Sequence, residues 1–265
     1  MYSINGVPLQ NPGMGWVLRA SSRPLPGVVK RRASVPSGGD GVVPAAAEYD
    51  AVSVTLVVKT RRAGLRSLYA LFGAPRLVLS YTDQPSLSAA VELASASPEG
   101  RGSAEEVVDA TFIVSIPGAF WRTAEVTSTA QNLTAASVVA KILNADGGIS
   151  APVGDAIVRV KGQVTALQVT DSSGAWMTFP AVPAGQWLRF HADTGRAFLT
   201  TTDTWTGGTE VSGDVDFGGP RNRFEIVPFF PTPADPTVRE GRLTVASTVR
   251  VGASIQVRAR AAHLV

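Results

Sequence analysis

The clearest alternation of hydrophobic and polar positions lies in residues 109–122, DATFIVSIPGAFWR. Apolar residues recur there at every second position, as in a strand that buries one face; they are Ala110, Phe112, Val114 and Ile116. Pro117 and Gly118 end the pattern, and after Arg122 the composition changes to Thr, Ser, Ala and Asn. We therefore predict that a first domain ends here and that a connection follows.

A second alternating segment, AVSVTLVVK at residues 51–59, precedes a helical pattern. Apolar residues at spacing i, i+3, i+4 and i+7 form one stripe along this helix; they are Leu65, Leu68, Tyr69 and Phe72. Gly73 and Pro75 then stop the helix. Shorter strands are predicted at 1–10, 13–19, 77–81 and 89–94. The first domain is predicted as a β-sandwich or barrel-like sheet with one helix lying on it.

Short strands separated by glycine- and proline-rich turns dominate the second half of the chain. We predict them at 156–161, 164–170, 175–179, 186–191, 196–202, 223–228, 242–246 and 254–260. This spacing is typical of a jelly-roll β-sandwich. Residues 134–144 fit a strand or a short helix equally well. The chain is thus predicted to be mainly β, with domains at 1–122 and 153–265 and a connection at 123–152.

The composition narrows the possible functions. The 265 residues include no cysteine, which excludes disulfides and thiolate metal sites, and only His191 and His263 offer imidazole. No metal or cofactor is therefore expected. The N-terminal sequence, MYSINGVPLQ, does not resemble a signal peptide. No apolar run approaches the roughly 20 residues of a membrane helix, so no membrane span is expected.

Basic residues form the first candidate contact surface, and the formal net charge is +3. Lys30, Arg31 and Arg32 precede a glycine-rich loop that contains Asp40. This cluster is either a solvated strand end or a contact with an acidic neighbouring subunit. The loop lacks the Gly-Lys-Ser/Thr ending of a phosphate-binding loop, so no nucleotide site is predicted.

Three further arginines lie near the start of the predicted helix: Arg61, Arg62 and Arg66. The helix dipole disfavours cations at that end. We interpret them as candidate subunit contacts. The alternative is that they are exposed to solvent, which would make their repulsion by the helix dipole negligible.

The sequence offers no catalytic arrangement. Asp214 and Asp216 are two residues apart and would share one face of a strand. They lie beside a glycine-rich turn, however, where a solvated hairpin edge is the simpler interpretation. The sequence contains no Gly-x-Ser-x-Gly motif that could supply a nucleophilic serine for His191 and Asp193. We therefore expect a protein that is not an enzyme. Trp205, in the loop DTWTGG, is the best candidate for a glycan or partner contact, with packing over the end of the sandwich as the alternative.

The order of these features resembles the distal tail proteins of long-tailed bacteriophages. The resemblance rests on the Asn5-Gly6 turn, the glycine loop at 38–41, the strand and helix of residues 49–72, LVLSYTDQP at 77–85 and AFWR at 119–122. In the second half, DAIVRVKG, GQWLRFHADTG and VRARAAHL are similar to the galectin-like or carbohydrate-module-like domain that such proteins carry.

This resemblance implies a structural virion protein, made in the host cytoplasm and located at the phage tail tip. It implies a homo-oligomeric ring, hexameric as is usual in that family, built from residues 1–122. The ring would join the tail tube protein to the tail-tip hub or baseplate and receptor-binding proteins, and it would leave a channel for passage of DNA. The alternative function is a host-surface adhesin that binds glycan through the C-terminal sandwich. A cell-wall hydrolase has the least support.

Overall fold

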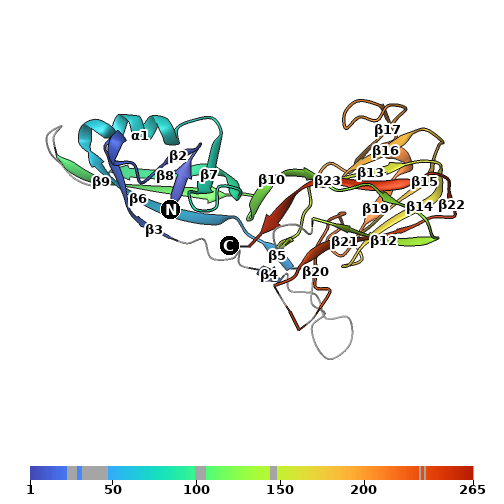
Figure 1. Ribbon diagram of the computed structural model, residues 1–265. Coiled ribbons are helices and arrows are strands. Elements are labelled where there is room, and N and C mark those ends of the chain that lie inside the picture. The colour runs from blue at the N-terminus through green and yellow to red at the C-terminus, as the bar shows by residue number, and fades with distance from the viewer. Residues whose placement is uncertain are drawn as a thin grey trace, which may run out of the picture. The chain divides into compact units, whose positions relative to one another are not determined.

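The computed structural model describes residues 1–22, 29–31, 47–98, 106–143, 148–232, 234–235 and 237–264. It divides into two compact units, Met1–Thr123 and Ala124–His263 (Figure 1). Both are built almost wholly from antiparallel strands, which confirms the predicted mainly β class.

The first unit contains two sheets that share the long strand β8. One sheet has the order β2-β1-β7-β8-β10, and the second half of β8 continues into the order β8-β9-β6-β3. The strands are β1 (Tyr2–Ile4), β2 (Val7–Pro8), β3 (Trp16–Ser21), β6 (Val52–Arg61), β7 (Leu77–Tyr81), β8 (Ser88–Pro98), β9 (Val107–Ile116) and β10 (Trp121–Thr127). A separate pair is formed by β4 (Val29–Arg31) and β5 (Ala47–Tyr49). Short 3-10 turns occur at η1 (Pro12–Met14) and η2 (Arg62–Gly64).

The alternation predicted for β6 and β9 is confirmed. These strands pair in register, Val54 with Val114 and Leu56 with Phe112, and their alternate residues are buried. The Asn5-Gly6 turn joins β1 to β2 with positive φ at both residues, as a two-residue hairpin requires.

The predicted helix is α1 (Leu65–Phe72), and it lies along one face of the sheet that contains β6, β8 and β9 (Figure 1). Its stripe is buried at Leu65, Leu68 and Phe72. The Phe72 ring stacks on Phe112 of β9 with centroids 3.9 Å apart. The helix ends at Gly73, where a Cβ would lie 2.9 Å from the Tyr69 carbonyl oxygen. Close approach, and not a positive φ, favours glycine here.

The second unit is a sandwich of two antiparallel sheets. The first has the order β18-β17-β16-β13-β23, with β10 and β11 beside β23. Its remaining strands are β11 (Gln131–Asn132), β13 (Ile157–Lys161), β16 (Trp187–His191), β17 (Arg196–Thr200), β18 (Thr209–Glu210) and β23 (Ser254–His263). Val158, Val160, Leu188 and Phe190 are fully buried on its inner face.

The opposite sheet has the order β12-β21-β14-β15-β19, with β20 on β21 and β22 on β14. Its members are β12 (Ser137–Ile142), β14 (Val164–Asp171), β15 (Trp176–Val182), β19 (Asp216–Gly218), β20 (Pro228–Phe229), β21 (Glu240–Ala246) and β22 (Val249–Arg250). The 3-10 turn η3 (Ser212–Asp214) precedes β19. Phe190 of the first sheet meets Phe217 and Phe224 at centroid distances of 5.4 and 5.7 Å.

Three expectations need correction. Residues 123–152 are not only a connection, because they contain the end of β10, β11 and β12, and β12 pairs with β21 along its whole length. The strand predicted at 223–228 is mostly irregular. Ile226 forms an isolated bridge with Val153, and β20 begins at Pro228. Asp214 lies in η3, and so it does not share a strand face with Asp216.

Candidate functional site

The arginines at the start of α1 do not behave alike. Arg62 forms an ion pair with Glu106 at 3.2 Å, and its backbone N–H donates to the Glu106 carbonyl. Arg61 ends β6 and is exposed. Arg66 is exposed, and it forms no ion pair with any residue that the structure describes. Arg62 therefore has a partner inside its own chain, while Arg66 remains the better candidate for a subunit contact.

The basic cluster is only partly within the described residues. Lys30 and Arg31 lie in β4, where the backbone register places them opposite Glu48 and Ala47 of β5. Arg32 and Asp40 lie outside the described residues. Their role as a subunit contact stays a prediction.

A group of charged side chains lies on the outer face of the second unit's first sheet. Arg159 of β13 is directly opposite Arg189 of β16. Each alternates with fully buried apolar neighbours, and each therefore points away from the core. Nevertheless, Arg159 is only 6% exposed and Arg189 only 2%. Something other than the core must cover them.

That cover is the 201–208 loop, which joins β17 to β18. The Asp203 carboxylate pairs with Arg159 at 2.5 Å, and the Gly207 carbonyl accepts from Arg189. The Trp205 ring lies against two guanidiniums, 4.3 Å from Arg159 and 4.4 Å from Arg258 of β23. The half-buried indole therefore packs on the outer face of its own unit by cation–π contact, which is closer to the packing alternative of the sequence analysis.

The two buried arginines differ in the polar partners that offset the hydration lost by their guanidinium groups. Arg159 also donates to the Gln256 side chain. Arg189 reaches only the Gly207 carbonyl, and its Nε has no hydrogen-bond partner among the described residues. Burial first, and then the charge of Arg159, lower the pKa of Arg189 below its ordinary value.

Other charged groups on this face are occupied by neighbours. Arg196 holds Glu210 with two hydrogen bonds of 2.9 and 2.5 Å, which lower the pKa of that carboxyl to about 2. Arg258 pairs with Glu125 at 3.6 Å. Burial and the nearby Arg189 lower the pKa of His191, so its neutral form is favoured.

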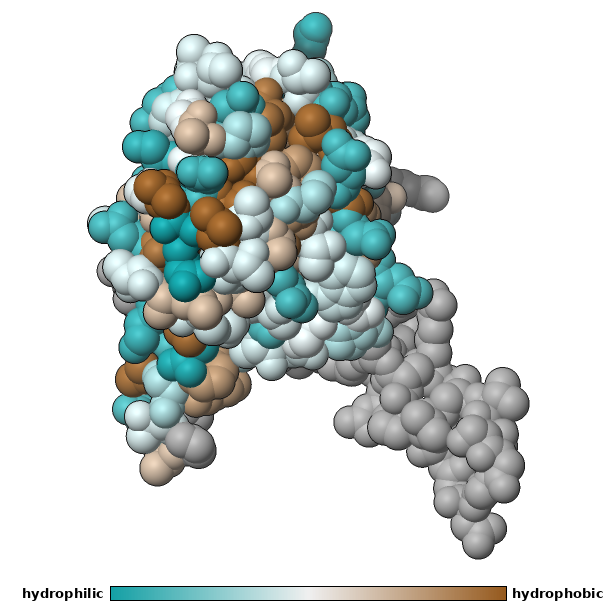
Figure 2. All heavy atoms as spheres, turned by 90° about the vertical axis from the view of Figure 1, so that its right-hand side faces the viewer, coloured by the Kyte–Doolittle hydropathy of each residue, from teal (hydrophilic) through white to brown (hydrophobic). Residues whose placement is uncertain are grey.

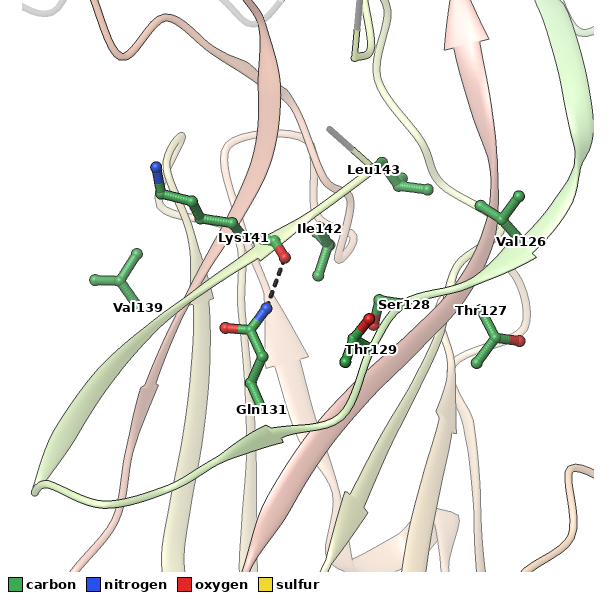
Figure 3. Close-up of a pocket in the computed structure, with 9 residues that line it drawn as sticks. All are labelled: Val126, Thr127, Ser128, Thr129, Gln131, Val139, Lys141, Ile142 and Leu143. Carbon is green, nitrogen blue, oxygen red and sulfur yellow. Dashed lines mark hydrogen bonds between the residues drawn. The ribbon is translucent and has the colours of Figure 1, made fainter. Parts of the chain in front are cut away.

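A pocket of about 550 Å³ lies between the β10–β11 segment and β12 (Figure 3). Gln131 donates to the Lys141 carbonyl at 2.7 Å, at the edge of β12 that pairs with no other strand among the described residues. The lining mixes hydroxyl and apolar side chains: Val126, Thr127, Ser128, Thr129, Gln131, Val139, Lys141, Ile142 and Leu143. The lining residues include no carboxylate or imidazole.

Apolar side chains also gather on one side of the second unit, bordered by hydrophilic ones (Figure 2). This is the side on which β22 is drawn in Figure 1. Val249 of β22 is 40% exposed, and the adjacent Val251 is 65% exposed.

No group of three or more His, Cys, Asp or Glu residues that would suit a metal ion occurs within the described residues. In the same part of the chain, no helix is long and apolar enough to cross a membrane. The geometry above consists of contacts between side chains and sheet faces, and it presents no paired nucleophile and base.

Comparison with known proteins concerns the fold. No protein-family model matches the sequence, and no curated protein does. The crystal structure of the SPP1 Dit protein, called a paradigm of the hub adsorption apparatus in phages that infect Gram-positive bacteria, matches with a TM-score of 0.60 and 12% identity. The match covers 98% of this chain and 99% of that one. The chain has the fold of that phage protein.

Two structures of the phage P2 baseplate in its activated conformation, with Ca and with Sr, also match at 12% identity. They cover 93% and 97% of this chain and 91% and 97% of those chains. Their TM-scores of 0.38 and 0.39 are too low to indicate a shared fold.

Proposed function

We propose that this chain is a structural protein of a phage tail tip, a distal tail protein whose first units associate in a hexameric ring. The observation that carries the proposal is the likeness to SPP1 Dit over nearly the full length of both chains, including both units. The proposal places the ring between the tail tube and the tail-tip hub, in the virion, with a channel for genome delivery. It assigns the chain no catalytic role.

The first unit has the features that a ring requires. Its outermost strands β2 and β3 each pair on one side only among the described residues, and unpaired strand edges can associate around a symmetry axis. Arg66 is exposed near one end of α1. We assign it, together with Lys30 and Arg31, to the contact with a neighbouring subunit.

The glycan-binding alternative has less support. Trp205, the residue that favoured it, is half-buried and already lies against Arg159 and Arg258. A ring-forming role does not depend on that residue, and a sugar contact elsewhere on the second unit would be compatible with it.

The mass of the purified full-length protein tests the ring. Light scattering should give six times the 27.6 kDa of one chain, and electron micrographs should show rings with a central opening. Arg66→Glu should weaken the assembly, and added salt should weaken the unmutated ring, because a surface ion pair between subunits is screened.

Arg76→Glu is the matched control, since Arg76 is also exposed but lies beyond the other end of α1. A protein that stays monomeric at every concentration and salt would count against the ring. If both variants lose assembly equally, Arg66 has no specific role in the subunit contact, although the proposal of a ring would still stand.

A further inference from the structure

The outer face that carries Arg159 and Arg189 has more positive than negative charge. Two guanidiniums are almost fully buried side by side across β13 and β16, and one carboxylate, Asp203, pairs with only one of them. Buried charges in proteins are normally paired, because an unpaired ion loses its hydration without compensation. This face therefore lacks one negative group.

No other acidic residue of the described chain supplies it. Two further carboxylates on this side are engaged, Glu210 with Arg196 and Glu125 with Arg258. The segment from 148 to 232, which contains both strands and the loop, is described without a break. Within it, Arg189 meets only a backbone carbonyl and the face of Phe198, and its Nε hydrogen has no acceptor.

The position of Asp203 shows what kind of group fits. Its side chain is 65% exposed, yet it pairs with the Arg159 guanidinium, which is itself buried. An oxyanion from outside can take the same position, and one with two or three oxygens can also accept from Arg189. Guanidinium groups favour such planar or tetrahedral oxyanions because several of their N–H donors point the same way.

We propose that the second unit binds an oxyanion, the phosphate or carboxylate group of a larger ligand, between Arg159 and Arg189 beneath the 201–208 loop. The ligand displaces the Asp203 carboxylate from Arg159, and Trp205 holds the loop over the bound group. A neutral sugar does not fit the same argument, because it leaves the charge of Arg189 uncompensated. This inference is independent of the ring.

Titration of the full-length protein tests the site. Inorganic phosphate and D-glucuronate are the probes, D-glucose is the neutral match for glucuronate, and sodium chloride is added at equal ionic strength. We expect saturable heat of binding with at least one oxyanion and a shift of the Trp205 indole N–H resonance, assigned with Trp205→Phe. A response to phosphate alone identifies a phosphate-bearing ligand, and one to glucuronate alone a carboxylate-bearing ligand.

Variants then locate the anion. Arg189→Met keeps the length of the side chain and should weaken binding about tenfold or more, because a charge-assisted hydrogen bond is lost. Arg196→Met, an exposed arginine on the same face that already has Glu210, should bind as the unmutated protein does. Asp203→Asn should bind more tightly, because the competing carboxylate is gone.

Three results would overturn the proposal. They are the absence of saturable binding to both oxyanions, an equal response to chloride or glucose, and equal affinity in Arg189→Met and Arg196→Met. If Arg189→Met does not fold, as circular dichroism would show, Asp203→Asn decides the matter: unchanged or weaker binding in that variant contradicts the displacement.

Discussion

The two units each cover one sheet face with a segment that is not a strand, but they use opposite chemistry. In the first unit, α1 places Leu68 and Phe72 on the sheet, exposed by 0% and 1%. In the second, the 201–208 loop covers Arg159 and Arg189, exposed by 6% and 2%. Similar burial thus arises from apolar contact in one unit and from guanidinium contacts in the other.

The difference has an energetic consequence. Apolar burial gains free energy in proportion to the area removed from water, and it needs no further partner. A buried guanidinium must recover its lost hydration through specific acceptors. The helix is therefore expected to be a fixed part of its unit, whereas the loop is held by a few polar contacts that a competing anion can replace.

The largest expected effect comes from weakening the apolar cover. Leu68→Ala should lower the free energy of unfolding of the first unit by about 2–5 kcal/mol, because it loses transfer free energy and leaves a cavity beside fully buried neighbours. Denaturant unfolding measures this loss. Arg66→Ala, on the exposed side of the same helix, should change it by no more than about 0.5 kcal/mol. Equal effects would show that α1 is not part of the core.

Weakening the polar cover should cost less. Trp205→Ala removes two cation–π contacts, with Arg159 and Arg258, and should lower the free energy of unfolding of the second unit by about 1–3 kcal/mol. Protease cleavage within the 201–208 loop should increase in the same variant. Val251→Ala, at a position that is 65% exposed, is the control. A cost as large as that of Leu68→Ala would contradict the contrast between the two covers.

The same contrast explains what the sequence could predict. The helix was predictable with its stripe, since 3.6-residue periodicity and a following Gly73 are local signals. The strands β6 and β9 were predictable for the same reason. The burial of Arg159 and Arg189 by the 201–208 loop could not be predicted. Both arginines occupy the polar positions of alternating strands, so in the sequence they resemble solvent-exposed residues.

Only long-range contacts bury these two arginines. Asp203 lies 44 residues from Arg159, and Gln256 lies 97 residues away. A charged residue in the middle of the apolar runs IVRVK and WLRFH was the available signal, although it does not tell what the arginine meets. Likewise, β12 has no strong pattern of its own, because its place in the sandwich is set by pairing with β21 about 100 residues later.

The smallest expected effect lies at the border of the outer face, where Glu210 of β18 meets Arg196 of β17. Hydrogen bonds from Arg196, and then from Ser212, lower the pKa of Glu210 from 4.5 to about 2. Because the folded pKa is below the unfolded one, the pair stabilises the fold above about pH 4.5, and this contribution is lost as the pH falls toward 2. NMR titration of the side-chain carboxyl should give a midpoint of about 2. Arg196→Gln should return it toward 4.5, and Ser212→Ala should raise it by less. A midpoint near 4.5 in the unmutated protein would show that the pair of Arg196 and Glu210 does not hold β18 against β17. The polar contacts on the outer face would then be limited to those of the 201–208 loop.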